Sequence, residues 1–168
     1  MEIDPQAPDE QAETGSPEPR PSPENGSVRH KFVSFFLGEK YYAMPANAVT
    51  EIVGRLTPTR LPDAPPALLG IAPLRGDILA VIDAGSDESL LQNSKQKAVV
   101  LRPQAPSIEL PVAFNVDRVG ELLQIGEDDI RFAASEDPLA TFESNVNGKP
   151  VLIIEPARIQ NFLSATEQ

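Results

Sequence analysis

The sequence predicts a mainly β protein in which two similar five-stranded units pack together behind an acidic, proline-rich N-terminal segment. From His30 onward, short apolar runs rich in Val, Ile, Phe and Tyr alternate with turn signals, a pattern typical of strands. The apolar pattern of the first half recurs about seventy residues later, which indicates a repeat. The chain has 18 prolines in 168 residues, above the average usage of about 5%, so part of it should stay outside a packed core.

The first 29 residues differ in composition from the rest of the chain. They contain six prolines, seven carboxylates and two arginines, which gives a net charge of −5, and they offer almost nothing to bury. Such a segment cannot offset the entropy that it would lose on ordering. We therefore expect a disordered tail over residues 1–29 and a folded domain over residues 30–168.

The first strands are predicted from apolar runs that end at turn signals. Phe32 to Leu37 is the first strand, "GEK" is a tight turn, and Tyr41 to Pro45 is the second strand. Ala46 to Val53 is predicted to form one or two helical turns, because its apolar residues recur at helical spacing. Thr57 to Leu61 is expected to be short and extended, because "PDAPP" after it breaks any regular element.

"RGD", at residues 75–77, is predicted to be a hairpin turn between two strands, Gly70 to Leu74 and Ile78 to Asp83. Gly76 supplies the positive φ that such a turn requires. Because Pro73 lacks a backbone donor, its strand should lie at a sheet edge or be distorted there. An adhesion role for the tripeptide is disfavoured, since the chain has neither an export signal nor cysteine.

A polar loop, Gly85 to Gln96, leads into the second half, where "NGK" at residues 147–149 is the strongest hairpin signal of the chain. Pro156 to Leu163 is expected to form a terminal helix, with the proline tolerated in its first turn. The strands expected in this half are Ala98 to Arg102, Leu110 to Val116, Glu121 to Ile125, Thr141 to Val146 and Pro150 to Ile154.

Two pairs of segments carry the repeat. "VTEI" from Val49 recurs as "VGEL" from Val119, and "RGDILAVIDAGS" aligns with "NGKPVLIIEPAR". The shared order of strand, turn, Val-x-Glu, hairpin and apolar strand predicts two pseudo-repeated subdomains that interleave along the chain. Each is too small to be comfortable alone, so each should cover the exposed edges of the other.

Composition excludes several classes of function. The 14 basic and 25 acidic residues give a net charge of −11, which disfavours nucleic acid and anionic lipid as partners. The absence of cysteine excludes disulfides and thiolate metal sites and is typical of a reducing compartment. No signal segment and no run of 18 apolar residues occur, so we expect a cytoplasmic protein without direct membrane insertion.

The residues needed for catalysis are also scarce. His30 is the one histidine, and its place beside the tail favours a solvated side chain over a base or metal ligand. No Gly-x-Ser-x-Gly elbow, P-loop or Gly-x-Gly-x-x-Gly is present. Asp77 and Asp83 flank one predicted strand and would lie roughly 20 Å apart, too far to act as an acid–base pair. We expect a binding protein with no catalytic residues, no metal and no cofactor.

Four segments occur in collinear order between Phe32 and Leu163: "FFLGEKYYAMP", "NAVTEIV", "LPDAPPALLGIAPLRGDILAVID" and "LPVAFNVDRVGELLQI". The series Leu-Pro-x-Ala-Pro, Gly, Leu-Arg-Gly and Val-Ile-Asp is the most specific part. On these segments the chain resembles the CheW family of bacterial chemotaxis coupling proteins. The resemblance implies two SH3-like β barrels, packed together, and a non-catalytic adaptor of two-component chemotaxis signalling.

The resemblance also implies partners and a site. Family members bridge the cytoplasmic tip of chemoreceptors, a helical hairpin, and a CheA-type histidine kinase. By motif match, the receptor-facing or partner-binding positions are Val49, Glu51, Gly70 and Arg75, and Glu51 is expected to pair with Arg75. The kinase-binding residues stay unassigned.

Three features depart from the family pattern. Ala72 and Pro73 stand where an apolar residue and an asparagine are common, "AGSDESLLQNSKQ" is unusually polar, and the acidic tail is long. Other functions are therefore kept open: a scaffold of a pilus-motility or other non-flagellar pathway, and a stand-alone SH3-like module that binds a proline-rich peptide, including its own tail. An enzyme that uses acidic residues is the third alternative.

Overall fold

The computed structural model of the chain describes residues 27–85, 96–103 and 110–159. Within these ranges, nearly all regular structure is β, with two 3-10 turns and one turn of α-helix at residues 156–159. The prediction of a mainly β fold is confirmed. The strands are β1 (Arg29–Leu37), β2 (Lys40–Pro45), β3 (Val49–Gly54), β4 (Leu68–Leu74), β5 (Asp77–Ile82), β6 (Lys97–Leu101), β7 (Val112–Val116), β8 (Arg118–Gly126), β9 (Arg131–Phe132), β10 (Ala140–Val146) and β11 (Lys149–Ile154), and the 3-10 turns are η1 (Ala46–Ala48) and η3 (Glu127–Asp129).

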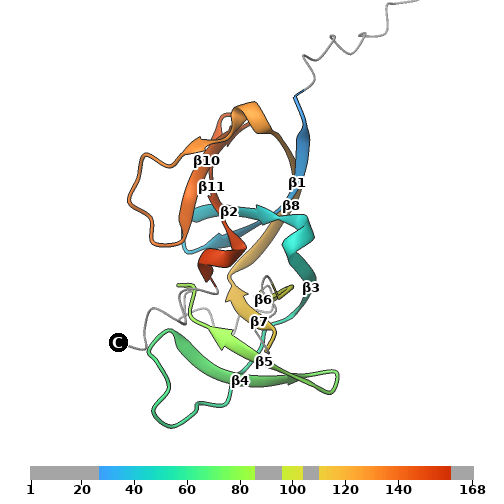
Figure 1. Ribbon diagram of the computed structural model, residues 1–168, viewed down its shortest axis with the longest axis vertical. Coiled ribbons are helices and arrows are strands. Elements are labelled where there is room, and N and C mark those ends of the chain that lie inside the picture. Colours follow the sequence, from blue (N-terminus) through green and yellow to red (C-terminus); the bar gives the residue numbers. More distant parts are fainter. Residues whose placement is uncertain (1–26, 86–95, 104–109, 160–168) are drawn as a thin grey trace, which may run out of the picture.

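The strands form two sheets, one in each half of the molecule (Figure 1). Sheet A has the order β8-β1-β2-β11-β10-β9, and sheet B has the order β3-β6-β7-β5-β4. The chain begins in sheet A, crosses to sheet B for five consecutive strands, and returns to complete sheet A. Each half of the fold is therefore built from segments that are distant in the sequence.

The two sheets share one pattern of pairing. In each, a single parallel contact, β2–β11 or β5–β7, joins two antiparallel groups. The hairpin at each end of the repeat, β4–β5 or β10–β11, carries a register shift at its open end, between Leu68 and Gly70 or between Ala140 and Phe142. Sheet A has six strands where five were predicted, because the two-residue strand β9 extends its edge.

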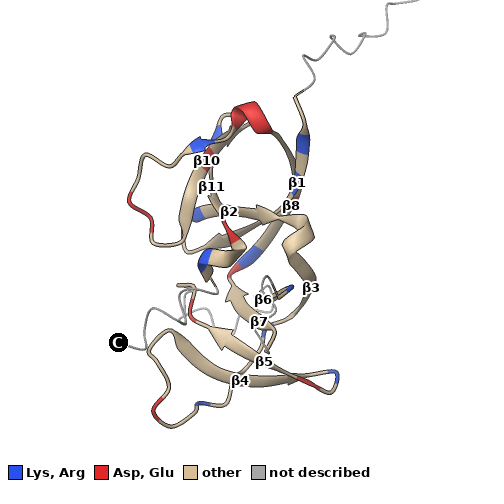
Figure 2. Cartoon of the chain, viewed as in Figure 1, with Lys and Arg blue, Asp and Glu red and all other residues tan. Residues whose placement is uncertain are grey.

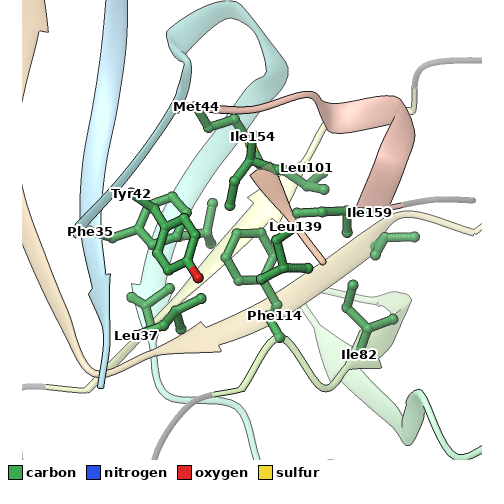
Figure 3. Packing of buried hydrophobic residues seen from close by; sticks show 14 of the residues in the cluster. Phe35, Leu37, Tyr42, Met44, Ile82, Leu101, Phe114, Leu139, Ile154 and Ile159 are labelled. Carbon is green, nitrogen blue, oxygen red and sulfur yellow. The ribbon is translucent and has the colours of Figure 1, made fainter. Parts of the chain in front are cut away.

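Buried side chains form three clusters. One lies against sheet B and one against sheet A, while the largest lies between the sheets (Figure 3). Phe35 belongs to this central cluster, stacked on Tyr42 at 6.1 Å and tilted against Phe114 at 5.3 Å between ring centroids. Phe32, on the same strand, belongs to the cluster of sheet A. Both faces of β1 are thus committed to apolar cores, which couples the two halves.

The predicted helix over Ala46–Val53 is wrong beyond its first turn. Ala46–Ala48 forms the 3-10 turn η1, and Val49–Gly54 is the edge strand β3, paired with β6. The apolar spacing of this segment fits a helix, but its β-branched residues favour an extended backbone that the sheet can pair. Strand β1 also begins earlier than expected, at Arg29, so the last residue assigned to the tail belongs to the sheet.

Both hairpin predictions are confirmed. Arg75 and Gly76 have φ of 50° and 89°, and Asn147 and Gly148 have φ of 52° and 80°, as type I′ turns require. Pro73 lies on β4, an edge strand as expected. The predicted loop at 86–95, most of the tail and residues 160–163 of the predicted terminal helix lie outside the described residues.

Candidate partner-binding site

Glu51 and Arg75 form an ion pair on the surface of sheet B. The Arg75 Nη1 atom lies 2.6 Å from Glu51 Oε2, as the resemblance led us to expect. Glu51 belongs to β3 at one edge of the sheet, and Arg75 belongs to the turn that follows β4 at the other edge. The pair therefore connects opposite edges of a curled sheet, and charged residues mark the tip of the β4–β5 hairpin (Figure 2).

The ion pair is worth little to stability. The Arg75 side chain is 72% exposed and the Glu51 side chain 27% exposed, so water screens their attraction. Exposed pairs of this kind contribute about 0–1 kcal/mol. The stronger consequence is geometric, because a guanidinium held by a carboxylate presents its remaining donors in a fixed direction.

A bulge in β3 sets where Glu51 points. Val49 pairs with Leu101 and Glu51 pairs with Val100, so one extra residue lies between them. Adjacent residues of a strand face opposite sides of a sheet. Val49 and Glu51 therefore point to opposite faces, although they are two residues apart in the chain. Their shared motif serves two tasks, one in the core and one at the surface.

Val49 is a core residue in this structure. Its half-buried side chain packs against the central cluster, beside Leu101. A partner would meet little of it without moving the core. Its expected role in binding stays a prediction, and its observed role is to anchor the strand that carries Glu51.

Gly70 holds a neighbouring segment in place through its backbone. Its φ of 147° favours glycine, and a Cβ there would lie 2.6 Å from the carbonyl carbon of Thr59 and 3.0 Å from the amide nitrogen of Arg60. The next residue, Ile71, exchanges two backbone hydrogen bonds with Thr59, at 2.8 and 3.0 Å. Gly70 therefore lets the segment before β4 run directly against the sheet, and the predicted extended piece at 57–61 makes its one bridge here.

Two exposed isoleucines lie near the ion pair, which the sequence analysis missed. Ile52 follows Glu51 on β3 and is 38% exposed, while Ile78 lies at the start of β5 and is 50% exposed. Ile52 pairs with Val99 of the central cluster, so it faces the side of sheet B that packs on sheet A. Exposed apolar residues beside an ordered ion pair are typical of a protein-binding surface.

A buried carboxylate forms a second polar cluster, far from the ion pair in sequence. Asp137 Oδ2 accepts hydrogen bonds from Lys40 Nζ at 2.8 Å and from the Tyr42 hydroxyl at 2.9 Å. Its Oδ1 accepts the backbone amides of Leu139 and Ala140. Sequence reasoning missed this cluster because its members are more than ninety residues apart.

The cluster shifts two pKa values in opposite directions. Burial alone raises the pKa of Asp137, but the hydrogen bonds from Lys40, Leu139 and Tyr42 outweigh it and lower that pKa below its ordinary value. Burial and the contact with Asp137 raise the pKa of Tyr42 far above its ordinary value. Asp137 therefore stays ionised and fastens the loop before β10 to strand β2.

Two searches of the described residues bear on other classes of site. No three His, Cys, Asp or Glu side chains among them gather closely enough to hold a metal ion. None of the helices in that part of the chain is long and apolar enough to cross a bilayer.

Comparison with known proteins identifies the family. Residues 31–162 match the family described as "CheW-like domain". "Chemotaxis protein CheW" of Helicobacter pylori is 30% identical over 103 residues, which cover 60% of this chain and 60% of that protein. "Chemotaxis protein CheW" of Rhizobium meliloti is 28% identical over 126 residues, which cover 74% of this chain and 78% of that protein.

A solved structure has the same fold. The crystal structure of the scaffolding protein TtCheW from Thermoanaerobacter tengcongensis superposes with a TM-score of 0.62 at 22% sequence identity. The superposition covers 76% of this chain and 89% of that one. Together with the sequence match over residues 31–162, it leads to one conclusion: this protein belongs to the CheW-like domain family.

Proposed function

We propose that this protein is a non-catalytic cytoplasmic adaptor that couples the cytoplasmic tip of chemoreceptors to a CheA-type histidine kinase. Membership of the CheW-like family supports this function, as do the relatives named as chemotaxis and scaffolding proteins. In this proposal, the surface around Glu51, Arg75, Ile52 and Ile78 receives the receptor. The isoleucines would pack against a helical hairpin, and the guanidinium would bond to its polar groups.

The conformation of Arg75 is the observation that carries the proposal. A φ of 50° is costly for a residue with a side chain, by about 1–2 kcal/mol. The corresponding turn of the other hairpin has Asn147 followed by Gly148, the pair that type I′ turns prefer. The fold therefore gains nothing from an arginine at this position. Strained residues of this kind occur where the side chain serves binding.

An adaptor of this kind acts by differential binding. It shifts a kinase between two signalling states only if its affinity differs between them. Weak contacts suffice when receptor, kinase and adaptor are held together in many copies, because binding then occurs at high effective concentration. A shape-defining ion pair suits this role better than a large apolar interface would.

A charge-swap series tests the proposed surface. The variants Arg75→Glu and Glu51→Arg and the double swap are compared in binding to a receptor tip fragment, with Lys97→Glu as an exposed control on sheet B. Each single change is expected to weaken binding at least tenfold, because it leaves two like charges in contact. The double swap should recover part of the loss, and the control should bind as the wild type does. Full binding by both single variants would overturn the assignment of this surface.

A further inference from the structure

Sheet A has a groove that neither the ion pair nor the central core uses. It measures about 950 Å³ and lies between the β1–β2 turn, the β10–β11 turn and the first half of β8. Its apolar lining includes Phe36, Tyr41, Val119, Val146 and Leu152. A groove of this size, apolar and open at one side, is suited to an extended peptide.

An aromatic ladder forms one wall of the groove. The Arg118 guanidinium lies 4.0 Å from the centroid of the Phe36 ring, and the Phe36 ring stacks on Tyr41 at 4.5 Å and 18°. Gly120 makes the ladder possible, because a Cβ there would lie 3.3 Å from Tyr41 Cε2 and would collide with Ser34 Oγ. The rings are thus held flat on neighbouring strands, as a rigid shelf.

Carboxylates line the groove around this shelf. Glu39, Glu121 and Glu143 all lie in its wall, and neither ion pair of the described residues includes any of them. Two of the cations in the wall are already engaged, Lys40 with Asp137 and Arg118 with Phe36. A peptide that brings an arginine would find acceptors waiting for it.

We propose that the groove binds the chain's own segment Pro17 to Pro23, "PEPRPSP", which lies outside the described residues. Alternate prolines favour the polyproline II conformation, whose ridges dock on flat aromatic side chains at little entropic cost. Arg20 stands in the middle of the segment, where it pairs with Glu121 or Glu143. The tail then covers this end of sheet A until a competing ligand displaces it. This inference goes beyond the adaptor function and does not depend on it.

The chain is long enough to make this contact within one molecule. Arg20 precedes Ser27, the first described residue, by seven positions, a reach of about 24 Å. Leu123 lines the near end of the groove and pairs with Phe32, five positions after Ser27, or about 17 Å along β1. The segment would run back alongside the first strands, with Pro23 near Leu123 and Pro17 toward Tyr41.

Paramagnetic relaxation on the full chain tests the contact. The protein has no cysteine, so Ser22→Cys gives one attachment point for a spin label. We expect the label to broaden the amide signals of Gly120, Glu121 and Asn147 to less than half of their intensity. The signals of Gly54 and Gly76, on sheet B, should keep theirs.

Variants and mixing identify the occupant. Arg20→Glu and Glu121→Lys should each restore most of the lost intensity, while Glu127→Lys, the same charge change outside the groove, should restore none. A mixture of spin-labelled chains with isotope-labelled chains that carry no spin label should show no broadening. Broadening in this mixture would assign the groove to a second copy and overturn the proposal. Groove signals of full intensity in the spin-labelled chain would also overturn it.

Discussion

At the scale of single residues, Arg75 and Asp137 show how one charged side chain serves binding and another serves the fold. Arg75 is exposed, strained and held by a single ion pair. The Asp137 side chain is 1% exposed and accepts four hydrogen bonds. Removing the first should cost binding, and removing the second should cost stability.

Replacing Arg75 by asparagine separates the two effects. Asparagine tolerates a positive φ, so Arg75→Asn should leave the free energy of unfolding unchanged or raise it by up to about 1 kcal/mol. Binding to a receptor tip fragment should weaken at least tenfold, because the ion pair and its donors are lost. Urea unfolding and titration calorimetry measure both quantities. Lower stability with wild-type affinity would contradict this division of roles.

Asp137 gives stability a pH dependence of known sign. Its pKa is lowered in the folded state, so its stabilisation is full above the ordinary value of 3.8 and is lost as pH falls through the folded value. Asp137→Asn should reduce the free energy of unfolding by roughly 1–3 kcal/mol at pH 7. The difference from the wild type should shrink below about pH 4. Asp128→Asn, at an exposed position, is the control, and a gap that stays constant down to pH 2 would refute this explanation.

At the scale of elements, Gly70 fixes the segment that crosses the edge of sheet B. Gly70→Ala would introduce a side chain at a positive φ and against the backbone of Thr59 and Arg60. We expect a loss of at least about 2 kcal/mol in unfolding free energy and weaker hydrogen-exchange protection of the Ile71 amide. Gly54→Ala is the matched control, since a Cβ at Gly54 would meet nothing within 4 Å. Equal effects of the two changes would argue against this role for Gly70.

Elements defined by local chemistry could be predicted from the sequence. Both two-residue hairpins were found because glycine marks their positive φ, and the edge position of Pro73 follows from its missing donor. Strand β3 was missed because its apolar spacing fits two periods and the pairing with β6 decides between them. The two-residue strand β9 is too short to leave a pattern.

The candidate site was predictable in part, for similar reasons. Glu51 and Arg75 belong to recognisable motifs, and the family resemblance links them although the chain alone does not. The Asp137 cluster and the groove of sheet A depend on contacts between distant segments, so no local pattern announces them. The opposite directions of Val49 and Glu51 depend on a bulge, which a pattern of side chains does not disclose.

At the scale of the whole molecule, the central cluster makes one body of two sheets. Phe35 of sheet A and Phe114 of sheet B meet in it, and the chain crosses between the sheets twice. The two halves therefore hold fixed positions, which an adaptor needs if it is to present different surfaces to different partners. The ion pair lies on sheet B and the aromatic groove on sheet A.

Co-sedimentation with receptor-bearing membranes tests the proposed adaptor role most directly. A CheA-type kinase from the same organism is mixed with membranes that carry a chemoreceptor, and its sedimented fraction is measured against the concentration of this protein. We predict that the fraction rises severalfold with wild-type protein, reaches a plateau, and rises far less with Arg75→Glu. A sedimented fraction of kinase that does not change at tens of micromolar protein would contradict the proposal that this chain connects the two.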